Sequence, residues 1–284
     1  MTAAEAYLIL AQTNARGRCL PFGIKQADRL FHLYVIGKTG VGKTTLLENL
    51  IIQDIDAGRG CALIDPHGDL VERVASRVPA WRREDLVYLD ALAPIQNKVG
   101  AFLSDRRIQR IVAGPGKSLR LRSIMDEGKV LLINLAKGKI GDDSSSVLGG
   151  LFVTALGLAA YSRADTPEAQ RRAFFIYVDE FQNFTTLSIA NMLSELRKYR
   201  VGMILAHQYL AQLDPDIRHA VLGNAGTLIT FRVGPEDAIL LAREFDPLLT
   251  PLDLMNLPNY EIYLKLMIDG TPSPPFSAST MPSA

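Results

Sequence analysis

Residues 37–45, "GKTGVGKTT", are the strongest indication of fold in this 284-residue chain. They match the pattern G-x-x-x-x-G-K-[ST] at Gly37, Gly42, Lys43 and Thr44. In this pattern the glycines turn backbone N–H groups toward phosphate oxygens, the lysine reaches the β- and γ-phosphates, and the threonine hydroxyl is a ligand for Mg²⁺. The residues expected to surround the phosphates are Gly37, Lys38, Thr39, Gly40, Val41, Gly42, Lys43, Thr44 and Thr45. The chain is therefore predicted to bind a nucleoside triphosphate, with ATP and Mg²⁺ as the expected pair.

The sequence on either side of this loop favours a phosphate-binding turn over an ordinary glycine-rich turn. The apolar run "HLYVIG" (32–37) precedes the loop and has the character of a buried strand. Apolar residues at helical spacing follow it, namely Leu47, Leu50, Ile51 and Ile55, and Gly58 ends the pattern. The start of such a helix would place its positive end at the phosphates.

Apolar, β-rich segments recur along the chain and alternate with helical patterns. They are "HLYVIG" (32–37), "CALIDP" (61–66), "LVYLD" (86–90), "KVLLINL" (129–135), "FFIYVD" (174–179), "VGMILAH" (201–207), "TLITFRV" (227–233) and "EIYLKLM" (261–267). Near-continuous hydrophobic strands that alternate with helices are typical of a mostly parallel sheet covered on both faces. A second helical stripe lies in "SIANMLSELRKYR" (188–200). We therefore predict an α/β fold.

The composition is that of an ordinary globular protein, with 48% hydrophobic and 21% charged residues. The net charge is +1, so contact with nucleic acid or a membrane would need a local patch. Two cysteines, Cys19 and Cys61, indicate a reducing compartment. The N-terminal residues lack a signal-peptide pattern, and the longest apolar stretch, 147–161, is too short for a typical membrane span. We expect a buried helix there, capped by Ser144 to Ser146, and a cytoplasmic protein.

Two segments fit the alternating pattern poorly. Residues 91–122 contain six Lys and Arg between 105 and 122 against one Asp. A solvated face is the favoured interpretation of that charge, and a nucleic-acid patch is the alternative. The Pro- and Ser-rich end "DGTPSPPFSASTMPSA" (269–284) is expected to lie over the surface or to be disordered.

Two adjacent carboxylates, Asp179 and Glu180, follow the apolar run "FFIYV" (174–178). Isolated buried carboxylates are costly, so their position calls for a ligand or a reaction. In P-loop enzymes an Asp at the end of a hydrophobic strand holds Mg²⁺, which is the role expected for Asp179 together with Thr44. Glu180 is expected to polarise the attacking water, and the alternative is that it caps the next helix. The pair favours hydrolysis over binding alone.

Other polar residues follow or precede the predicted strands. Gln208, after "VGMILAH", would lie near the γ-phosphate if its strand is placed between those of the P-loop and Asp179; otherwise it is a polar loop residue. Arg197 is the candidate for an arginine finger that acts on a neighbouring subunit, and a cation at a helix end is the alternative. The further residues considered, with less support, are Lys198, Arg200 and Arg232 as cations and His67 as a loop residue facing the ligand.

Six segments taken together resemble the HerA/FtsK superfamily of hexameric DNA-pumping ATPases. They are "HLYVIGKTGVGKTTLLENLIIQDI", "IDPHGDL", "INLAKGKIG", "YVDEFQNF", "LRKYRVGMILAHQYLAQL" and "GNAGTLITFRVG". The similarity covers about residues 22–280 and is greatest to the cytosolic domain of conjugative coupling proteins of the TraG/TraD kind. It implies a RecA-like core in a six-membered ring, with ATP between subunits and DNA in the channel. It also implies Walker A at 37–45, Walker B at Asp179 and Glu180, a sensor role for Gln208 and a trans-acting role for Arg197.

Two features depart from the coupling proteins. Those proteins usually have N-terminal transmembrane helices, and we expect no transmembrane segment here. They also commonly carry a helical insertion after the strand equivalent to "LVYLD", and residues 91–122 resemble only its final part. The chain is accordingly divided into an N-terminal extension (1–21), a RecA-like ATPase core (22–270) with the helical insertion largely missing, and a Pro/Ser-rich tail (271–284).

The function that the resemblance implies is an ATP-hydrolysing ring motor that moves DNA in conjugative or type IV secretion transfer. Its expected partners are DNA, further copies of the chain in a homo-hexamer, and secretion-channel proteins at the inner face of the membrane. The alternatives are a secretion or pilus-assembly ATPase that acts on protein, a HerA-like DNA-processing helicase or translocase, and a remnant that binds ATP without acting as a motor.

Overall fold

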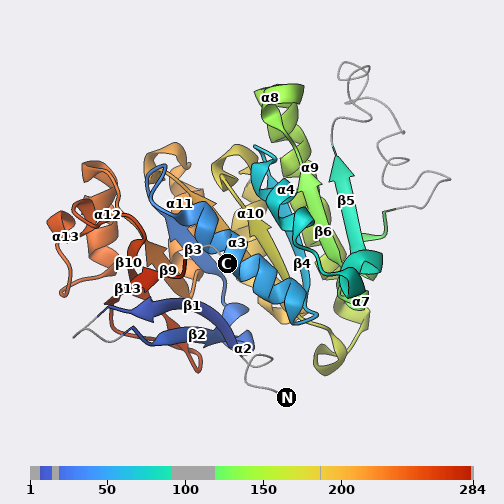
Figure 1. The fold of residues 1–284 in the computed structure, drawn as a ribbon, viewed down its shortest axis with the longest axis horizontal. Coiled ribbons are helices and arrows are strands. Elements are labelled where there is room, and N and C mark those ends of the chain that lie inside the picture. The colour runs from blue at the N-terminus through green and yellow to red at the C-terminus, as the bar shows by residue number, and fades with distance from the viewer. Residues whose placement is uncertain (1–6, 15–18, 91–118, 186, 283–284) are drawn as a thin grey trace.

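The computed structural model describes residues 7–14, 19–90, 119–185 and 187–282 (Figure 1). One large sheet runs through this part of the chain, with the strand order β2-β1-β13-β10-β9-β3-β8-β7-β4-β6-β5. Most of the basic segment 105–122, and most of the stretch 91–122 that resembles a helical insertion, lie outside the described residues.

All eight predicted strands are present in this sheet. They are β3 (Leu33–Ile36), β4 (Gly60–Asp65), β5 (Leu86–Asp90), β6 (Val130–Asn134), β7 (Phe174–Val178), β8 (Val201–His207), β9 (Thr227–Thr230) and β10 (Glu261–Lys265). The seven strands from β9 to β5 pair in parallel, and β10 pairs with β9 antiparallel. The prediction of a mostly parallel sheet is therefore confirmed, and all parallel strands end at the same edge, hereafter the carboxyl edge.

Both ends of the chain add strands to this sheet. β1 (Tyr7–Thr13), β2 (Pro21–Lys25) and β13 (Phe276–Thr280) extend it beyond β10, and all three pair antiparallel. The prediction that the Pro/Ser-rich tail lies over the surface or is disordered is wrong for β13, in which Ala278 is buried. The small and polar residues of "FSAST" hide this strand because only alternate side chains, Ala278 and Thr280, face the interior. A short hairpin of β11 (Met267–Ile268) and β12 (Thr271–Pro272) lies between β10 and β13 in the chain.

Helices cover both faces of the sheet, as predicted. On one face lie α3 (Lys43–Asp56) and α4 (Asp69–Ser76), whose apolar residues form one buried cluster with the strands. The helices of the other face are α7 (Leu121–Glu127), α9 (Asp142–Tyr161), α10 (Leu187–Glu195), α11 (Pro215–Asn224), α12 (Pro235–Glu244) and α13 (Pro251–Met255). The short helices α2 (Gln26–Arg29) and α8 (Lys137–Ile140) precede β3 and α9. Each face thus has its own hydrophobic core.

Helix α9 differs from its prediction in length, capping and burial. It begins at Asp142 with Gly141 as the N-cap residue, so Ser144 to Ser146 lie inside the helix and do not cap it. With the 3₁₀ turn that follows, it spans 24 residues, Asp142–Asp165. By length and composition alone it could cross a membrane, but core helices of soluble proteins share these properties. Only 33% of its most apolar 18-residue stretch is buried. One face packs on the protein, and Val147, Leu151 and Leu158 are exposed on the other.

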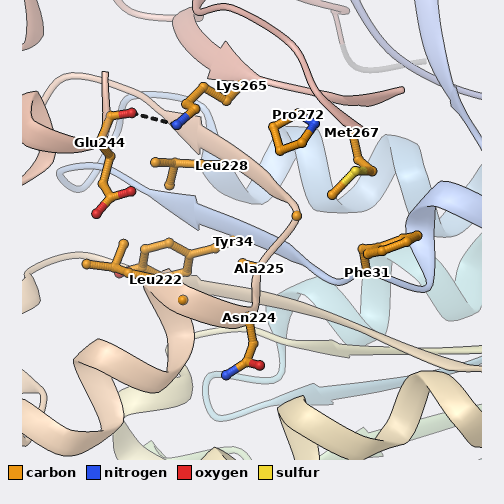
Figure 2. Close-up of a pocket in the computed structure, with 12 residues that line it drawn as sticks. Phe31, Tyr34, Leu222, Asn224, Ala225, Leu228, Glu244, Lys265, Met267 and Pro272 are labelled. Carbon is orange, nitrogen blue, oxygen red and sulfur yellow. Dashed lines mark hydrogen bonds between the residues drawn. The ribbon is translucent and has the colours of Figure 1, made fainter. Parts of the chain in front are cut away.

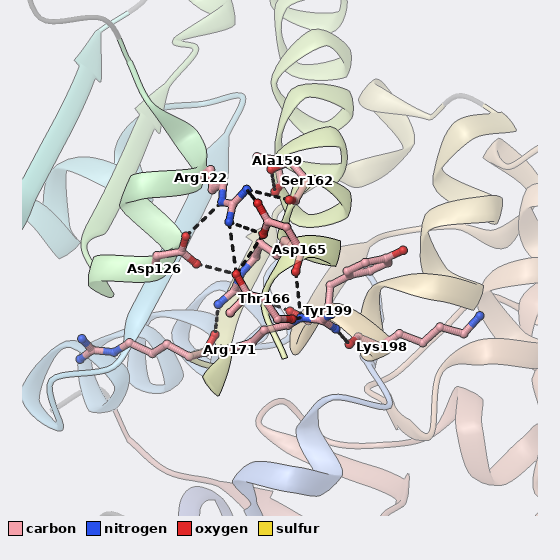
Figure 3. A network of polar contacts seen from close by, with 11 residues as sticks. Arg122, Asp126, Ala159, Ser162, Asp165, Thr166, Arg171, Lys198 and Tyr199 are labelled. Carbon is pink, nitrogen blue, oxygen red and sulfur yellow. Dashed lines mark hydrogen bonds and ion pairs between the residues drawn. The ribbon is translucent and has the colours of Figure 1, made fainter. Parts of the chain in front are cut away.

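A network of arginines ties helix ends together at the opposite, amino edge of the sheet (Figure 3). Arg122 in α7 pairs with Asp165 and donates to the carbonyl of Ser162 at the end of α9. Arg171 donates to the Thr166 and Lys198 carbonyls. Carbonyls at helix ends lack partners within the helix, so these guanidinium groups stabilise the fold by donating to them.

A buried ion pair fixes helix α3 against strand β7. Both nitrogens at the tip of the Arg29 guanidinium donate to the Asp54 carboxylate, at 2.8 and 2.6 Å. The Tyr177 hydroxyl donates to the same carboxylate at 2.6 Å. Asp54 lies in α3, which follows the P-loop, and Tyr177 lies two residues before Asp179. The contact therefore joins the helix that follows the P-loop to the strand that presents the acidic pair.

Candidate active site

Three neighbouring parallel strands bring the candidate residues to one edge of the sheet. The order β3-β8-β7 places β8 between the strand of the P-loop and the strand of the acidic pair, as the role considered for Gln208 requires. The P-loop follows β3, Gln208 follows β8, and Asp179 and Glu180 follow β7. All of them therefore lie at the carboxyl edge, where open α/β sheets bind ligands.

The P-loop has the backbone that phosphate binding requires. Gly40 and Gly42 have φ angles of 77° and 116°, which residues with a Cβ rarely adopt. The Lys43 side chain is buried, and its Nζ donates to the carbonyls of Gly37, at 2.5 Å, and Lys38, at 2.9 Å. Burial lowers the pKa of Lys43, while Glu180 and Asp179 act in the opposite direction. The ammonium group thus lies inside the loop, within electrostatic reach of both acids.

Asp179 is held in an environment that disfavours its charge. Its side chain is 5% exposed, and burial first, then the charges of Glu180 and Asp65, raise its pKa to about 7. Lys43 and the N–H of Glu180, which donates to Oδ1 at 3.0 Å, offset part of this rise. Burial and the neighbouring carboxylates both disfavour the ionised form of Asp179. A cation bound beside it would therefore stabilise its charge.

Replacing Asp179 with Asn should stabilise the protein in the absence of nucleotide and metal. Because the folded-state pKa of Asp179 lies above its ordinary value of 3.8, its cost to stability grows as pH rises from about 4 to 7 and is constant above that. At pH 8 we expect Asp179→Asn to raise the free energy of unfolding by about 1–4 kcal/mol.

Urea unfolding in EDTA, with the exposed Asp56→Asn as the matched control, measures this effect. The gain should nearly disappear near pH 4, where Asp179 of the folded state and about half of the unfolded chains bind the proton. A loss of stability at pH 8 would contradict the assignment.

Glu180 is the centre of a chain of hydrogen bonds that reaches the P-loop. Its Oε1 accepts from Gln208 Nε2 at 2.6 Å and its Oε2 accepts from Gln182 Nε2 at 2.7 Å. The Gln208 Oε1 in turn accepts from the Thr39 hydroxyl at 2.8 Å. Glu180 precedes the 3₁₀ turn Phe181–Phe184, but its side chain makes no capping hydrogen bond there. Glu180 thus has the N-cap position that the alternative expects, but its carboxylate does not cap the turn and is oriented toward the glycine loop through Gln208.

Gln208→Ala removes the group that links Glu180 to the P-loop. We expect ATP hydrolysis to fall by about tenfold to a hundredfold, because a hydrogen bond to a charged group is worth about 1.5–3 kcal/mol. ATP affinity should change little, because the main-chain cradle and Lys43 remain. Steady-state turnover and equilibrium binding, measured beside the exposed Gln212→Ala, test this prediction. Equal loss of binding and turnover would assign Gln208 to the binding of the nucleotide.

The donor groups at this edge suit Mg²⁺. Thr44 offers a hydroxyl and Asp179 a buried carboxylate whose raised pKa a neighbouring cation would reverse. Within the described residues no group of three or more His, Cys, Asp or Glu side chains could hold a metal ion. Mg²⁺ is commonly bound by one or two carboxylates together with substrate phosphates and water, so the two residues fit that ion.

Arg197 lies far from this site in the same chain. It belongs to the 3₁₀ turn Leu196–Tyr199, before β8, and its guanidinium carbon stacks 3.5 Å from the centre of the Phe31 ring. The seven residues of β8 separate it from the carboxyl edge by about 20 Å. It therefore cannot reach a phosphate bound at the P-loop of the same chain, and an action on a second copy of the chain stays a prediction.

Two of the four lesser candidates, Arg232 and His67, lie at the carboxyl edge, whereas Lys198 and Arg200 precede β8 at the amino edge. Arg232 follows β9; its Nη1 donates to the Leu257 carbonyl at 3.1 Å and its Nη2 donates to Asn259 Oδ1 at 2.8 Å. Its guanidinium group thus holds a neighbouring loop. His67 is exposed in the loop after β4, as expected from its place in the sequence.

Two residues of the candidate active site, Gln182 and Asp65, were not predicted from the sequence. Gln182 holds Glu180, and its place two residues later in "DEFQ" is the signal that could have identified it. Asp65 ends β4, raises the pKa of Asp179 and accepts hydrogen bonds from the backbone N–H groups of Leu70 and Val71 in α4. Its effect depends on the pairing of β4 with β7, which no local pattern reveals.

A cavity of about 280 Å³ lies at the amino edge, away from the P-loop (Figure 2). Phe31, Tyr34, Leu228 and Met267 line it, and Lys265 closes one side by donating to the Glu244 carbonyl at 2.8 Å. The candidate residues of the carboxyl edge do not take part in it.

Comparison with known proteins identifies the fold. No protein-family model and no curated protein sequence matches this chain. Among solved structures, the unbound bacterial conjugative coupling protein TrwBdeltaN70 matches with a TM-score of 0.64 and 15% identity, over 95% of this chain and 88% of that one. TrwB in complex with ADP and Mg²⁺ matches with a TM-score of 0.62 and 15% identity, over 95% and 89%. The genome-packaging NTPase B204 from Sulfolobus turreted icosahedral virus 2, with ATP-gammaS, matches with a TM-score of 0.51 and 12% identity, over 88% and 97%.

The TM-scores show a likeness of fold, and at identities of 12–15% the likeness extends to the fold alone. The chain therefore has the RecA-like P-loop NTPase fold that the conjugative coupling protein TrwB and a viral genome-packaging NTPase share.

Proposed function

We propose that this chain hydrolyses ATP and works as a ring-shaped motor on DNA, in conjugative or type IV secretion-like transfer. The observation that carries the proposal is the hydrogen-bond chain from Thr39 through Gln208 to Glu180. It joins the glycine loop to a buried carboxylate that is placed to activate water. The fold that this chain shares with a coupling protein and a packaging NTPase supports DNA as the load.

The proposed chemistry divides among five side chains and the P-loop backbone of the carboxyl edge. Main-chain N–H groups of the P-loop and the Lys43 ammonium bind the phosphates. Thr44 and Asp179 would hold Mg²⁺, which supplies charge neutralisation and geometry for phosphoryl transfer. Glu180 accepts a proton from the attacking water, and the amide of Gln208 keeps its carboxylate directed at the phosphate side. Because these groups are fixed in advance, their charges act without reorganisation.

The ring is proposed because Arg197 lies at the amino edge, out of reach of its own P-loop. An arginine from a neighbouring subunit can raise phosphoryl transfer by about 10³- to 10⁵-fold. Mixing Arg197→Ala subunits with Glu180→Gln subunits tests this directly, once native mass spectrometry confirms that mixed rings form. Recovery of activity above that of either variant supports a site shared between subunits, and no recovery contradicts it.

An ATPase titration with single- and double-stranded DNA, with oligomer mass recorded in parallel, tests the proposed load. DNA-stimulated turnover that falls steeply with salt supports a DNA motor, because phosphate contacts release counterions. Turnover that ignores DNA and rises with a membrane secretion partner would instead support a protein-secretion ATPase. This function requires a cytoplasmic protein that is recruited to the inner face of the membrane.

A further inference from the structure

The ring of Tyr260 rests against the P-loop. Tyr260 immediately precedes β10, and the pairing of Tyr263 with Thr230 places the start of β10 at the carboxyl edge. A Cβ atom added to Gly42 would lie 2.7 Å from Cδ1 of the Tyr260 ring. Only glycine therefore allows this approach, and the aromatic ring lies directly beside the residue from which α3 begins.

The backbone of Tyr260 is held in a strained conformation. Its φ angle is 67°, in the left-handed region that is unfavourable for a bulky side chain. Its N–H donates to the Val41 carbonyl at 2.9 Å, and its own carbonyl accepts from the Thr280 N–H at 2.8 Å and the Thr280 hydroxyl at 3.1 Å. Hydrogen bonds to the P-loop and to the last strand thus hold the backbone that carries the Tyr260 ring.

Arg232 holds the loop that leads to Tyr260. Its guanidinium group bonds the Leu257 carbonyl and Asn259, while its own carbonyl accepts from the Lys38 N–H at 2.9 Å. The loop 257–260 is therefore tied to the P-loop near Lys38 as well as at Val41. These two attachments place the backbone of Tyr260 beside the site where the P-loop would bind a ligand.

One side of the ring remains open. Tyr260 is 51% exposed, although its other side packs on Gly42. The C-terminal segment lies next to Tyr260, since Thr280 bonds to the Tyr260 carbonyl. Asn49 in α3 holds the same segment by donating to the carbonyls of Met281 and Pro282. In the sheet, β8 and β7 lie on one side of β3, and β7 leads to the acidic pair. β9 and β10 lie on the other side of β3. A nucleotide whose terminal phosphate faces Glu180 would direct its base toward the flank of Tyr260.

We propose that Tyr260 stacks on the base of the nucleotide whose phosphates the P-loop binds. The inference rests on the proposed function, because it concerns the same bound nucleotide. A ring face accepts any base, whereas discrimination needs hydrogen bonds to base edges. Tyr260 therefore adds affinity for the nucleoside part of ATP and GTP alike.

Calorimetric binding of ATP, GTP and inorganic tripolyphosphate, each with Mg²⁺, tests the proposal on the full chain. Tyr260→Ala should raise the Kd for ATP and for GTP by about fivefold to a hundredfold, the range for loss of one stacked base. The Kd for tripolyphosphate, which has no base, should stay within about twofold. Tyr260→Phe keeps the ring and should bind all three as the unsubstituted protein does.

The outcomes separate this inference from the proposed function. Unchanged ATP affinity in Tyr260→Ala overturns it, as does equal weakening of ATP and tripolyphosphate, which would mean a distorted P-loop. Either result leaves the nucleotide site itself in place, provided that tripolyphosphate still binds the unsubstituted protein. Failure of the unsubstituted protein to bind both ligands overturns the proposed function and the stacking together.

Discussion

Glu180→Gln should abolish ATP turnover while the protein still binds ATP. An amide cannot accept the proton of the attacking water, and loss of a general base costs about 10²- to 10⁴-fold in rate. The substitution keeps the shape of the side chain. Its amide oxygen can still accept from Gln208 Nε2, and its amide nitrogen can donate to Gln182 Oε1 once the Gln182 amide rotates. Lys43 and the glycine cradle remain, and we expect the Kd for ATP to change by less than about threefold.

Steady-state phosphate release and equilibrium binding, measured on the same preparation, check this result. Glu168→Gln is the matched control, because that exposed carboxylate lies in the turn Glu168–Gln170, which precedes β7 at the amino edge of the sheet. Near-normal turnover in Glu180→Gln would remove Glu180 from its role and would point to another base.

Lys43→Ala should remove most of the affinity for nucleotide. The ammonium group now donates to the Gly37 and Lys38 carbonyls, and the phosphates would receive those hydrogen bonds together with its charge. A charge-assisted hydrogen bond is worth about 1.5–3 kcal/mol, so we expect the Kd for ATP to rise by at least tenfold. Tripolyphosphate should lose affinity equally, because Lys43 contacts phosphate alone.

Calorimetry with both ligands measures this loss, and the exposed Lys139→Ala in α8 serves as the control. Thermal unfolding of the variant without nucleotide shows whether the fold survives the removal of a buried cation that partly balances Asp179 and Glu180. ATP binding of unchanged strength in a folded variant would contradict the assignment of the P-loop.

The core of the fold and most of the candidate site were predictable because their signals are local. Each parallel strand is a continuous apolar run, and the P-loop pattern needs a strand before it and a helix after it, all within residues 33–56. The position of Asp179 and Glu180 at the end of "FFIYV" identified the acidic pair in the same way. Parallel strands end at one edge, so the pattern already implied a shared location.

Errors arose where local composition and tertiary context disagree. β13 was expected to be a surface tail, because small and polar residues do not reveal a strand whose alternate side chains are buried. Helix α9 begins earlier than its apolar run, since Asp142 and Asp143 suit the first turn of a helix, where negative charge is favourable. Burial of one face cannot be read from a uniformly apolar segment.

Local signals in the sequence specify a parallel sheet around a P-loop and an acidic pair, because the strand, loop and helix patterns lie in adjacent residues. The order of the strands in the sheet is visible in the folded structure alone. That order joins Glu180 to Gln208 and Thr39, brings Asp65 within electrostatic reach of Asp179, places Arg197 at the far edge and sets Tyr260 against Gly42. These contacts depend on pairings between segments distant in the chain, whose free energies no local pattern records.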